Sequence, residues 1–309
     1  MSKDESKPDP SDICEAQAVP FPTAWQPLTA RGVAAFSRAA IGRLLFVQLI
    51  VALLVAASIL WFLATNWFPT VREAIRQLPE TGQIRNQELV SPRTSTAPLA
   101  ETRFLALVMD VEGAGIPNLK ADLRVEFHRR NFALCSVLGC LWIGYPKGQT
   151  VLFSQLELES WWAAWEPVIC TVIVLSVVIW LFLTWVVLAT LYCPLARTYA
   201  FFKDRQLTLL GSWKLSAAAL LPAALMTGTG LVLYGLGLTD LIGFLVLFAL
   251  HLAVGWAYLF ASPLRLPRAS DAIAAVRQNP FTPPGTVPAN PFIDPPSAAS
   301  QDTASKPDA

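Results

Sequence analysis

Residues 44–68 read LLFVQLIVALLVAASILWFLATNWF, an apolar run that contains no charged side chain. At about 1.5 Å per residue, a helix of this length crosses roughly 30 Å of hydrocarbon. The composition of the whole chain agrees, because 54% of its 309 residues are hydrophobic and only 15% are charged. These values are typical of membrane proteins rather than of soluble domains. The run therefore predicts a membrane helix.

A cleaved secretory signal is the alternative interpretation of this run, with Val55-Ala56-Ala57 as a small-residue cleavage site. However, 43 residues precede the run, and it is longer than the apolar core of a usual signal. We therefore expect residues 44–68 to remain in the chain as its first transmembrane helix.

Two further apolar stretches predict three more membrane helices. Residues 167–193 are long enough for one helix, whereas the tract 215–261 is too long for one. This tract divides at Gly237-Leu238-Thr239-Asp240, because a carboxylate and turn-forming residues are costly inside lipid. The remaining helices are expected at residues 167–193, 217–238 and 241–261.

Lysine and arginine residues near the helix ends indicate the orientation, because cytoplasmic loops retain positive charge. These residues are Arg31, Arg38, Arg43, Arg197, Lys203, Arg205, Lys214, Arg265, Arg268 and Arg277. They all fall on one side of the four predicted helices, so we expect both termini in the cytoplasm. The cytoplasmic segments would be a disordered tail at residues 1–43, a loop at 194–216 and a disordered, proline-rich tail at 262–309. Residues 69–166 would then lie outside.

Within residues 69–166 the pattern changes from continuously apolar to alternating, which is typical of half-buried strands. The expected strands are residues 83–90, 104–111, 121–128 and 150–158, with 132–145 as two more strands joined by a turn at 136–139. The predicted fold class is therefore an α-helical membrane protein. Four transmembrane helices carry a small extracytoplasmic β-rich (α+β) domain inserted between helices 1 and 2.

Residues 78–82 read LPETG, the pentapeptide that sortases recognise in surface proteins. A sorting signal stands just before a carboxy-terminal apolar span, but three predicted helices follow this one, so cleavage would anchor almost nothing. We interpret Leu78-Pro79 as the end of a short helix that begins near Thr70. Thr81-Gly82 would then turn the chain into a strand.

The order of short motifs in this region resembles a known family. The motifs are Leu78-Pro79, Ile84-x-Asn86 with Leu89, Leu107-Val108-Met109-Asp110 with Gly113, and the strand 123–127. Placed between a first span and a later helical bundle, this order is similar to the uncharacterised bacterial family called domain of unknown function 1189, over about residues 39–261. The resemblance implies an inner-membrane protein with an extracytoplasmic sheet domain and no established activity.

Cys135 and Cys140 are the only cysteines in the predicted outside domain, and an oxidising compartment permits a bridge between them. In an extended strand they would lie about 17 Å apart at roughly 3.3 Å per residue, which is beyond disulfide reach. A tight turn at residues 136–139 would bring them together. A disulfide and a pair of buried, apolar cysteines therefore both stay open.

His251 is the one imidazole inside a predicted span, where ionisable groups are candidates for function. Its candidate hydrogen-bond partners are Thr227, Thr229 and Tyr234. An interhelical contact is favoured over a proton or ion site, because no Asp or Glu lies in any span to build a relay. The spacing of Ala224 and Gly228 likewise favours close helix packing over a broken helix around a substrate.

The carboxy-terminal tail repeats one tripeptide, as Asn279-Pro280-Phe281 and Asn290-Pro291-Phe292. In a eukaryotic cytoplasm such a pair would be a ligand for endocytic adaptor domains. The alternative is two Asx-Pro turns, each with an exposed Phe that docks on a neighbouring protein.

The chain contains no phosphate loop, no nucleophile with a matched base, no metal-ligand spacing and no basic nucleic-acid patch. We therefore expect no enzyme, no cofactor, no metal site and no nucleic-acid partner. The leading hypothesis is a polytopic membrane protein whose outside domain senses, binds or scaffolds envelope components. A small-solute or lipid transporter built on helices 2–4 is the runner-up, and a trafficking ligand that uses the paired tripeptides is the third. The expected partners are the lipid bilayer, a protein bound by the carboxy-terminal tail, and a second copy of the chain.

Overall fold

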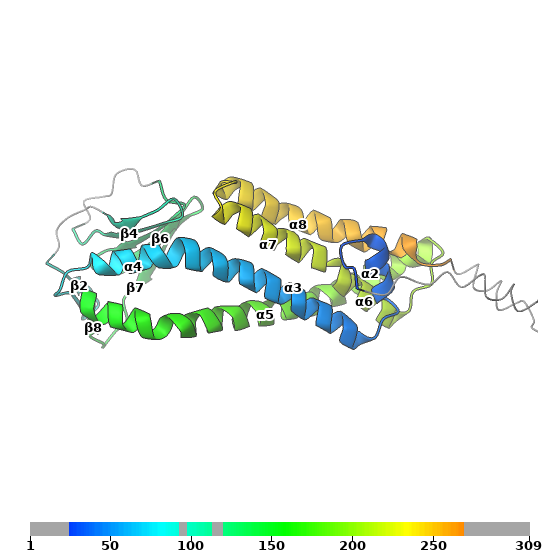
Figure 1. Ribbon diagram of the computed structural model, residues 1–309, viewed down its shortest axis with the longest axis horizontal. Helices are drawn as coiled ribbons and strands as arrows, with labels where there is room; N and C mark the ends of the chain where they lie inside the picture. Colours follow the sequence, from blue (N-terminus) through cyan, green and yellow to red (C-terminus); the bar gives the residue numbers. More distant parts are fainter. Residues whose placement is uncertain (1–24, 93–97, 113–119, 269–309) are drawn as a thin grey trace, which may run out of the picture. The chain divides into compact units, whose positions relative to one another are not determined.

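The structure is a computed structural model that describes residues 25–92, 98–112 and 120–268. Within these residues, four helical segments are long and apolar enough to cross a membrane. They are Ile41–Arg76, Gln155–Phe202, Leu209–Gly235 and Leu241–Arg265, and Figure 1 labels their parts. A small β-sheet region is also present. The prediction of four such helices with a small sheet region is confirmed at this level.

The first segment is one continuous helical run made of α3 (Ile41–Phe62), a π-helical turn η1 (Leu63–Trp67) and α4 (Phe68–Arg76). The wide turn comes just before Pro69, whose ring would clash with the carbonyl of Thr65 in a regular α-helix. The separate short helix that we expected near Thr70 is therefore a direct continuation of the first span.

The second segment, α5 (Gln155–Phe202), has 48 residues and extends beyond the predicted span 167–193 at both ends. Ser154 precedes it in an extended conformation, and Glu157 lies in its first turn, where the helix dipole stabilises a carboxylate. The strand predicted at 150–158 is therefore wrong beyond β8 (Val151–Leu152). Alternation of a few residues does not distinguish a strand from the polar start of a long helix.

The third segment is divided into α6 (Leu209–Ala219) and α7 (Leu221–Gly235), with Pro222 in the first turn of α7. The side chain of Thr208 caps α6, because its Oγ1 accepts a hydrogen bond from Gly211 N at 3.0 Å. The loop predicted at 194–216 is therefore mostly helical.

The last segment contains α8 (Leu241–Ala261), whose bounds match the predicted span, followed by η2 (Pro263–Arg265). Asp240 Oδ1 accepts a hydrogen bond from Gly243 N at 2.7 Å and so caps α8. A carboxylate at this turn thus starts the helix that follows it.

We predict a disordered amino-terminal tail at residues 1–43, but part of this segment is helical. A short helix, α2 (Ala30–Phe36), precedes α3, and Val33 and Phe36 are fully buried. The prediction is wrong for residues 30–43, because the apolar side chains of α2 pack into the helical core. Of the predicted carboxy-terminal tail, residues 262–268 are described and the remainder lies outside the described residues.

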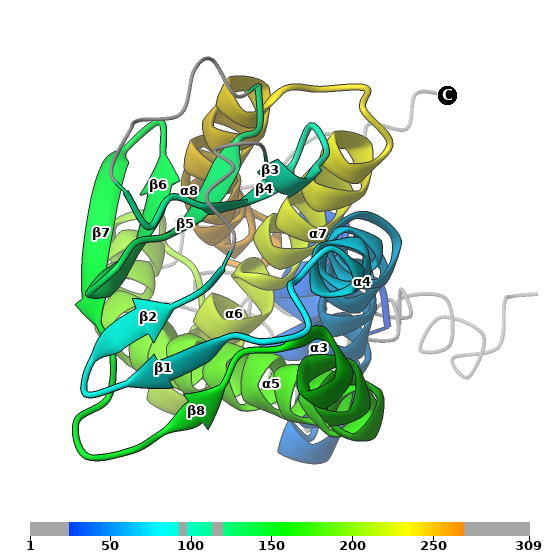
Figure 2. The same cartoon turned by 90° about the vertical axis from the view of Figure 1, so that its left-hand side faces the viewer.

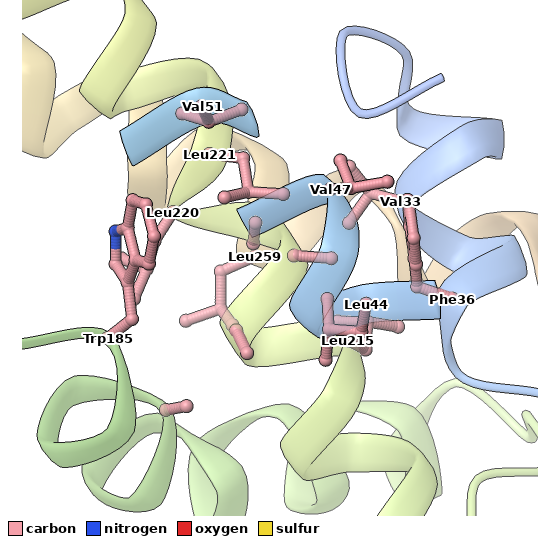
Figure 3. Packing of buried hydrophobic residues seen from close by; sticks show 14 of the residues in the cluster. Val33, Phe36, Leu44, Val47, Val51, Trp185, Leu215, Leu220, Leu221 and Leu259 are labelled. Atoms are coloured by element: carbon pink, nitrogen blue, oxygen red, sulfur yellow. The ribbon is translucent and has the colours of Figure 1, made fainter. Parts of the chain in front are cut away.

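The core of the helical bundle brings side chains from α2, α3, α5, α6, α7 and α8 together (Figure 3). Phe36 and Leu44 meet Leu215 in this cluster, and Trp185 of α5 points toward Leu220. Small residues allow α3 and α7 to approach, since a Cβ on Gly228 would lie 3.5 Å from Val55 Cγ2. This contact agrees with the packing interpretation of the glycine spacing.

The sheet region consists of two sheets (Figure 2). The first has the order β2-β1-β8, with β1 (Gln83–Arg85) antiparallel to β2 (Glu88–Val90) and to β8. The second has the order β3-β4-β5-β6-β7. Its strands are β3 (Pro98–Glu101), β4 (Leu105–Met109), β5 (Leu123–Phe127), β6 (Asn131–Ser136) and β7 (Gly139–Gly144). All neighbours in this sheet are antiparallel except β4 and β5, which run parallel.

The strand predicted at 83–90 is a hairpin instead, because Asn86 and Gln87 adopt positive φ angles of 52° and 66°. The two strands predicted within 132–145, with a turn at 136–139, are present as β6 and β7.

The LPETG stretch contributes only its first residue, Leu78, to the core of the sheet region, and Glu80 and Thr81 are exposed. Leu78 is buried in a cluster with Leu89 and Met109, and α4 has already ended at Arg76. Gly82 does not adopt a left-handed conformation. It allows a close approach, because a Cβ at this position would lie 2.4 Å from the carbonyl oxygen of Phe153. This stretch is therefore a structural connection in the described fold.

Candidate functional site

Aromatic side chains join the sheet region to the helices. Phe104, just before β4, is buried against Phe62 of α3 and Tyr234 of α7, with ring centroids 5.4 Å and 5.0 Å away. Tyr234 also stacks on Phe62 and on Phe244 of α8. A Cβ on Gly235 would lie 2.9 Å from ring atoms of Trp61 and Phe62, so a larger residue would push the helices apart. We call this contact the junction.

Polar groups fix the same junction. Tyr234 Oη donates a hydrogen bond to Asp122 Oδ2 at 2.7 Å. Arg103 donates from Nη2 to the carbonyl of Thr239 at 2.7 Å and from Nη1 to the carbonyl of Gly237 at 3.3 Å. Gly237 has a φ of 74°, a left-handed conformation that favours glycine. This conformation lets the chain turn just after the end of α7. The turn between α7 and α8 is thus held by a side chain from the sheet region.

A second contact ties the first long helix to the second. Arg72 of α4 forms a bidentate ion pair with Glu166 of α5, in which Nε donates to Oε2 at 3.2 Å and Nη2 donates to Oε1. Bidentate arginine–carboxylate pairs fix orientation as well as distance. The two helices that flank the sheet region in sequence are therefore connected next to it.

A cavity of about 430 Å³ lies beside the junction, between η1, α4 and the loop from β3 to β4. Its wall carries the carboxylates of Glu73 and Glu101, the guanidinium of Arg103 and the amide of Asn66. Thr70 Oγ1 donates to Thr102 Oγ1 at 3.3 Å and links the two sides of the cavity. A ligand bound here would contact both the first helix and the sheet region.

Two titratable groups in the sheet region are perturbed. A hydrogen bond from Arg130, together with the charge of Arg129, lowers the pKa of the Glu88 carboxyl below its ordinary value. Burial raises the pKa of the Tyr145 hydroxyl, which donates to the carbonyl of His128 at 2.9 Å. Both groups lie in the sheet region, and neither lines the junction cavity.

Cys135 and Cys140 are joined in a disulfide, as direct partners on β6 and β7 with Cα atoms 4.0 Å apart. The tight turn that this alternative required is present, and Gly139 closes it with a φ of 119°. The bridge thus crosses one hairpin and leaves the junction untouched.

His251 lies near the middle of α8 and lines a second cavity of about 580 Å³ among the helices. Its Nδ1 lies against the carbonyl of Phe248 in its own helix. Of the three partners considered for it, Thr227 lines the same cavity and Thr229 does not. Tyr234 donates its hydrogen bond to Asp122, and Thr227 donates to the carbonyl of Ala223 in its own helix.

The remaining predictions concern tail motifs and metals. The tripeptides Asn279-Pro280-Phe281 and Asn290-Pro291-Phe292 lie outside the described residues. In the described part of the chain, no group of three or more His, Cys, Asp or Glu side chains could hold a metal ion.

Sequence reasoning missed Arg103 and Asp122 at the junction. Both precede a strand and look like ordinary exposed loop charges. The one available signal was the turn marked by Gly237 and Asp240 between two predicted spans. The backbone carbonyls of such a turn can accept hydrogen bonds from another part of the chain.

These features define a chain with four helices of membrane-crossing length and a sheet region fixed to their ends. No family model matches the chain, and no curated protein or solved structure is significantly similar to it. The resemblance to domain of unknown function 1189 therefore stays a prediction.

Proposed function

We propose that the chain is a non-enzymatic protein of a bacterial inner (plasma) membrane that binds an envelope component and transmits binding to its helices. In this proposal both termini are cytoplasmic and the sheet region is extracytoplasmic. The single observation that carries the proposal is the junction, where the sheet region bonds α7 and the turn before α8. A sheet region that served only as a passive cap would not need to hold this turn.

The cavity beside the junction is the proposed binding site. Glu73 and Glu101 offer hydrogen-bond acceptors and negative charge, so they favour a polar ligand with amine or other donor groups. Arg103 lines this cavity and also holds the α7–α8 turn. A ligand that broke or strengthened the hydrogen bonds from Arg103 to the turn would therefore shift the turn between two positions.

Hydrogen–deuterium exchange of the full chain in lipid nanodiscs tests this proposal, with soluble muropeptides as the amine-bearing probe. We expect slower exchange in residues 101–105 and also in the turn 236–240. Glu101→Gln should weaken binding, whereas Glu159→Gln on the exposed start of α5 is the matched control and should not. No binding, or slower exchange that stops at the sheet region, would contradict the proposal.

Transport of a small solute or lipid by the later helices is a second candidate, and the cavity beside His251 favours it. No charged side chain lines that cavity, which argues for an apolar cargo rather than an ion. Loss of a transport phenotype in His251→Leu, with normal membrane insertion, would support this candidate over the first.

A further inference from the structure

The turn that joins β6 to β7, residues 136–139, presents two apolar side chains to the surroundings. Val137 is 64% exposed, and Leu138 is 85% exposed, more than any other large apolar side chain in the described part of the chain. Tight hairpin turns usually carry glycine, asparagine or aspartate, which suit the backbone and the surrounding water. Positions that break such a local rule are expected at functional sites. These two side chains therefore need a partner that the sheet itself does not supply.

The turn is fixed to the sheet. Ser136 and Gly139 form the last pair of the ladder between β6 and β7, and the Cys135–Cys140 disulfide lies next to that pair. Leu138 N also donates a hydrogen bond to Ser136 Oγ at 3.2 Å. Because both ends of the turn are tied to each other, the two apolar side chains stay at the tip of the hairpin.

The register of the sheet places the turn beside the junction. Ser136 pairs with Leu123 of β5, and Leu123 directly follows Asp122. The carboxylate of Asp122 accepts the hydrogen bond from Tyr234 in the last turn of α7. With about 4.8 Å between neighbouring strands and about 3.3 Å per residue along a strand, the turn lies within about 10 Å of Asp122. It therefore belongs to the edge of the sheet that touches the helices.

The same edge lies at the ends of two helices of membrane-crossing length. α7 ends at Gly235 and α8 begins at Leu241, in segments that are long and apolar enough to cross a membrane. Residues 236–240 would then lie at the membrane surface, and Leu236 and Leu238 within them are 58% and 69% exposed. The hairpin tip and the turn between α7 and α8 thus both present apolar side chains at the same end of α7.

Lipid fits this position better than a second copy of the chain. Residues 131–146 contain no charged side chain, so contact with lipid would remove no charge from water. A second copy that paired along the free edge of β7 would cover residues 139–144, but Val137 and Leu138 lie beyond the last ladder pair and would stay exposed. The headgroup region of a membrane, by contrast, accepts apolar side chains to a depth of roughly 5–10 Å.

We propose that the tip of the β6–β7 hairpin binds the lipid surface, with Val137 and Leu138 in the boundary between headgroups and acyl chains. This contact holds the five-stranded sheet against the membrane next to the turn between α7 and α8. It is a second attachment of the sheet, in addition to the hydrogen bonds of the junction. The proposal rests on the membrane topology proposed above, and it is independent of any ligand in the junction cavity.

Site-specific photo-crosslinking of the full chain tests the proposal, in nanodiscs of phosphatidylethanolamine and phosphatidylglycerol. Benzoylphenylalanine replaces Leu138, and lipid adducts are measured by mass spectrometry after the disulfide has been verified in the same sample. The matched control is Leu156 in the first turn of α5, which is 76% exposed. It lies about 16 Å of helix before the predicted span 167–193, and Figure 1 shows that α5 begins beside β8, well beyond the end of α7. We expect about tenfold more lipid adduct at Leu138 than at Leu156, the preference of one leucine side chain for apolar surroundings over water.

A probe at Leu250, in the middle of α8 and 49% exposed, is the positive control for membrane crossing. Adducts at Leu250 without adducts at Leu138 would overturn the hairpin proposal alone, whereas no adducts at either position would also overturn the proposed topology. Equal yields at Leu138 and Leu156, or crosslinks mainly to a second copy of the chain, would likewise overturn the hairpin proposal.

A charge at the tip gives an independent test. With the probe moved to Val137, Leu138→Asp should lower the yield of lipid adduct about tenfold, because a carboxylate resists transfer out of water. Leu138→Met is the matched control and should leave the yield unchanged. An unchanged yield in Leu138→Asp, with the disulfide intact, would show that the tip does not enter lipid.

Discussion

Removal of the Tyr234 hydroxyl is the sharpest perturbation of the junction. In Tyr234→Phe the ring contacts with Phe62 and Phe104 remain, and only the 2.7 Å hydrogen bond to Asp122 is lost. Hydrogen bonds to charged groups contribute about 1.5–3 kcal/mol when both partners are shielded from water. Asp122 is half-buried, so we expect the lower end, about 1.5 kcal/mol. This corresponds to an approximately tenfold larger fraction of molecules in which the contact between the sheet region and α7 is open.

The assay is hydrogen–deuterium exchange in residues 120–122 and in the turn 236–240, which should both become faster in Tyr234→Phe. A double-mutant cycle with Asp122→Ala, which removes the acceptor, isolates the pair, and the two effects should be less than additive. Tyr145→Phe is the matched control, because the Tyr145 hydroxyl bonds the carbonyl of His128 within the sheet region. Strict additivity, or an equal change at the turn in Tyr145→Phe, would refute the idea that this bond holds the junction.

Two other predictions address the LPETG stretch and the topology. Gly82→Val would place a Cβ 2.4 Å from the carbonyl oxygen of Phe153 and disturb the hydrogen bond from Phe153 N to Gly82 O. We expect this change to destabilise the fold by about 2–4 kcal/mol, so protein abundance in membranes should fall. Thr81→Ala, which would abolish a sorting signal, should leave abundance and membrane retention unchanged, and the reverse pattern would restore the processing interpretation. Reporter fusions after Glu101 should report the outside, and fusions after Asp204 and Ser297 the cytoplasm; an outside report at Asp204 would show that the distribution of positive charge misled us.

The helices could be predicted where hydrophobicity alone decides. Residues 241–261 were delimited correctly, because Asp240 supplies both the polar break and the cap. The ends of α5 were missed, because its polar extensions carry no apolar run. The burial of α2 was missed for a related reason, since a helix of seven residues has too short a pattern to stand out from a tail.

The candidate site was less predictable than the fold. Tyr234 was noted as a polar group on a span, but its partner Asp122 is 112 residues away in the sequence. No local sequence pattern predicts a contact between residues so far apart. Arg103 donates to backbone carbonyls, and because every residue has one, the sequence does not indicate which carbonyls it contacts. His251 is the only imidazole in a predicted span, but the cavity that it lines is built by residues of α3, α5, α7 and α8 that no local pattern relates.

The distance in sequence between Asp122 and Tyr234 also sets an order of events during synthesis. The strand that follows Asp122 leaves the ribosome 112 residues before its partner, a delay of roughly 6–22 s at 5–20 residues per second. During that interval Phe104 can pack only on Phe62 of α3, because α7 and its Tyr234 ring have not yet been synthesised. A nascent chain stalled before residue 234 would therefore expose an aromatic surface to chaperones and proteases, so the junction also marks a chain whose translation has been completed through α7.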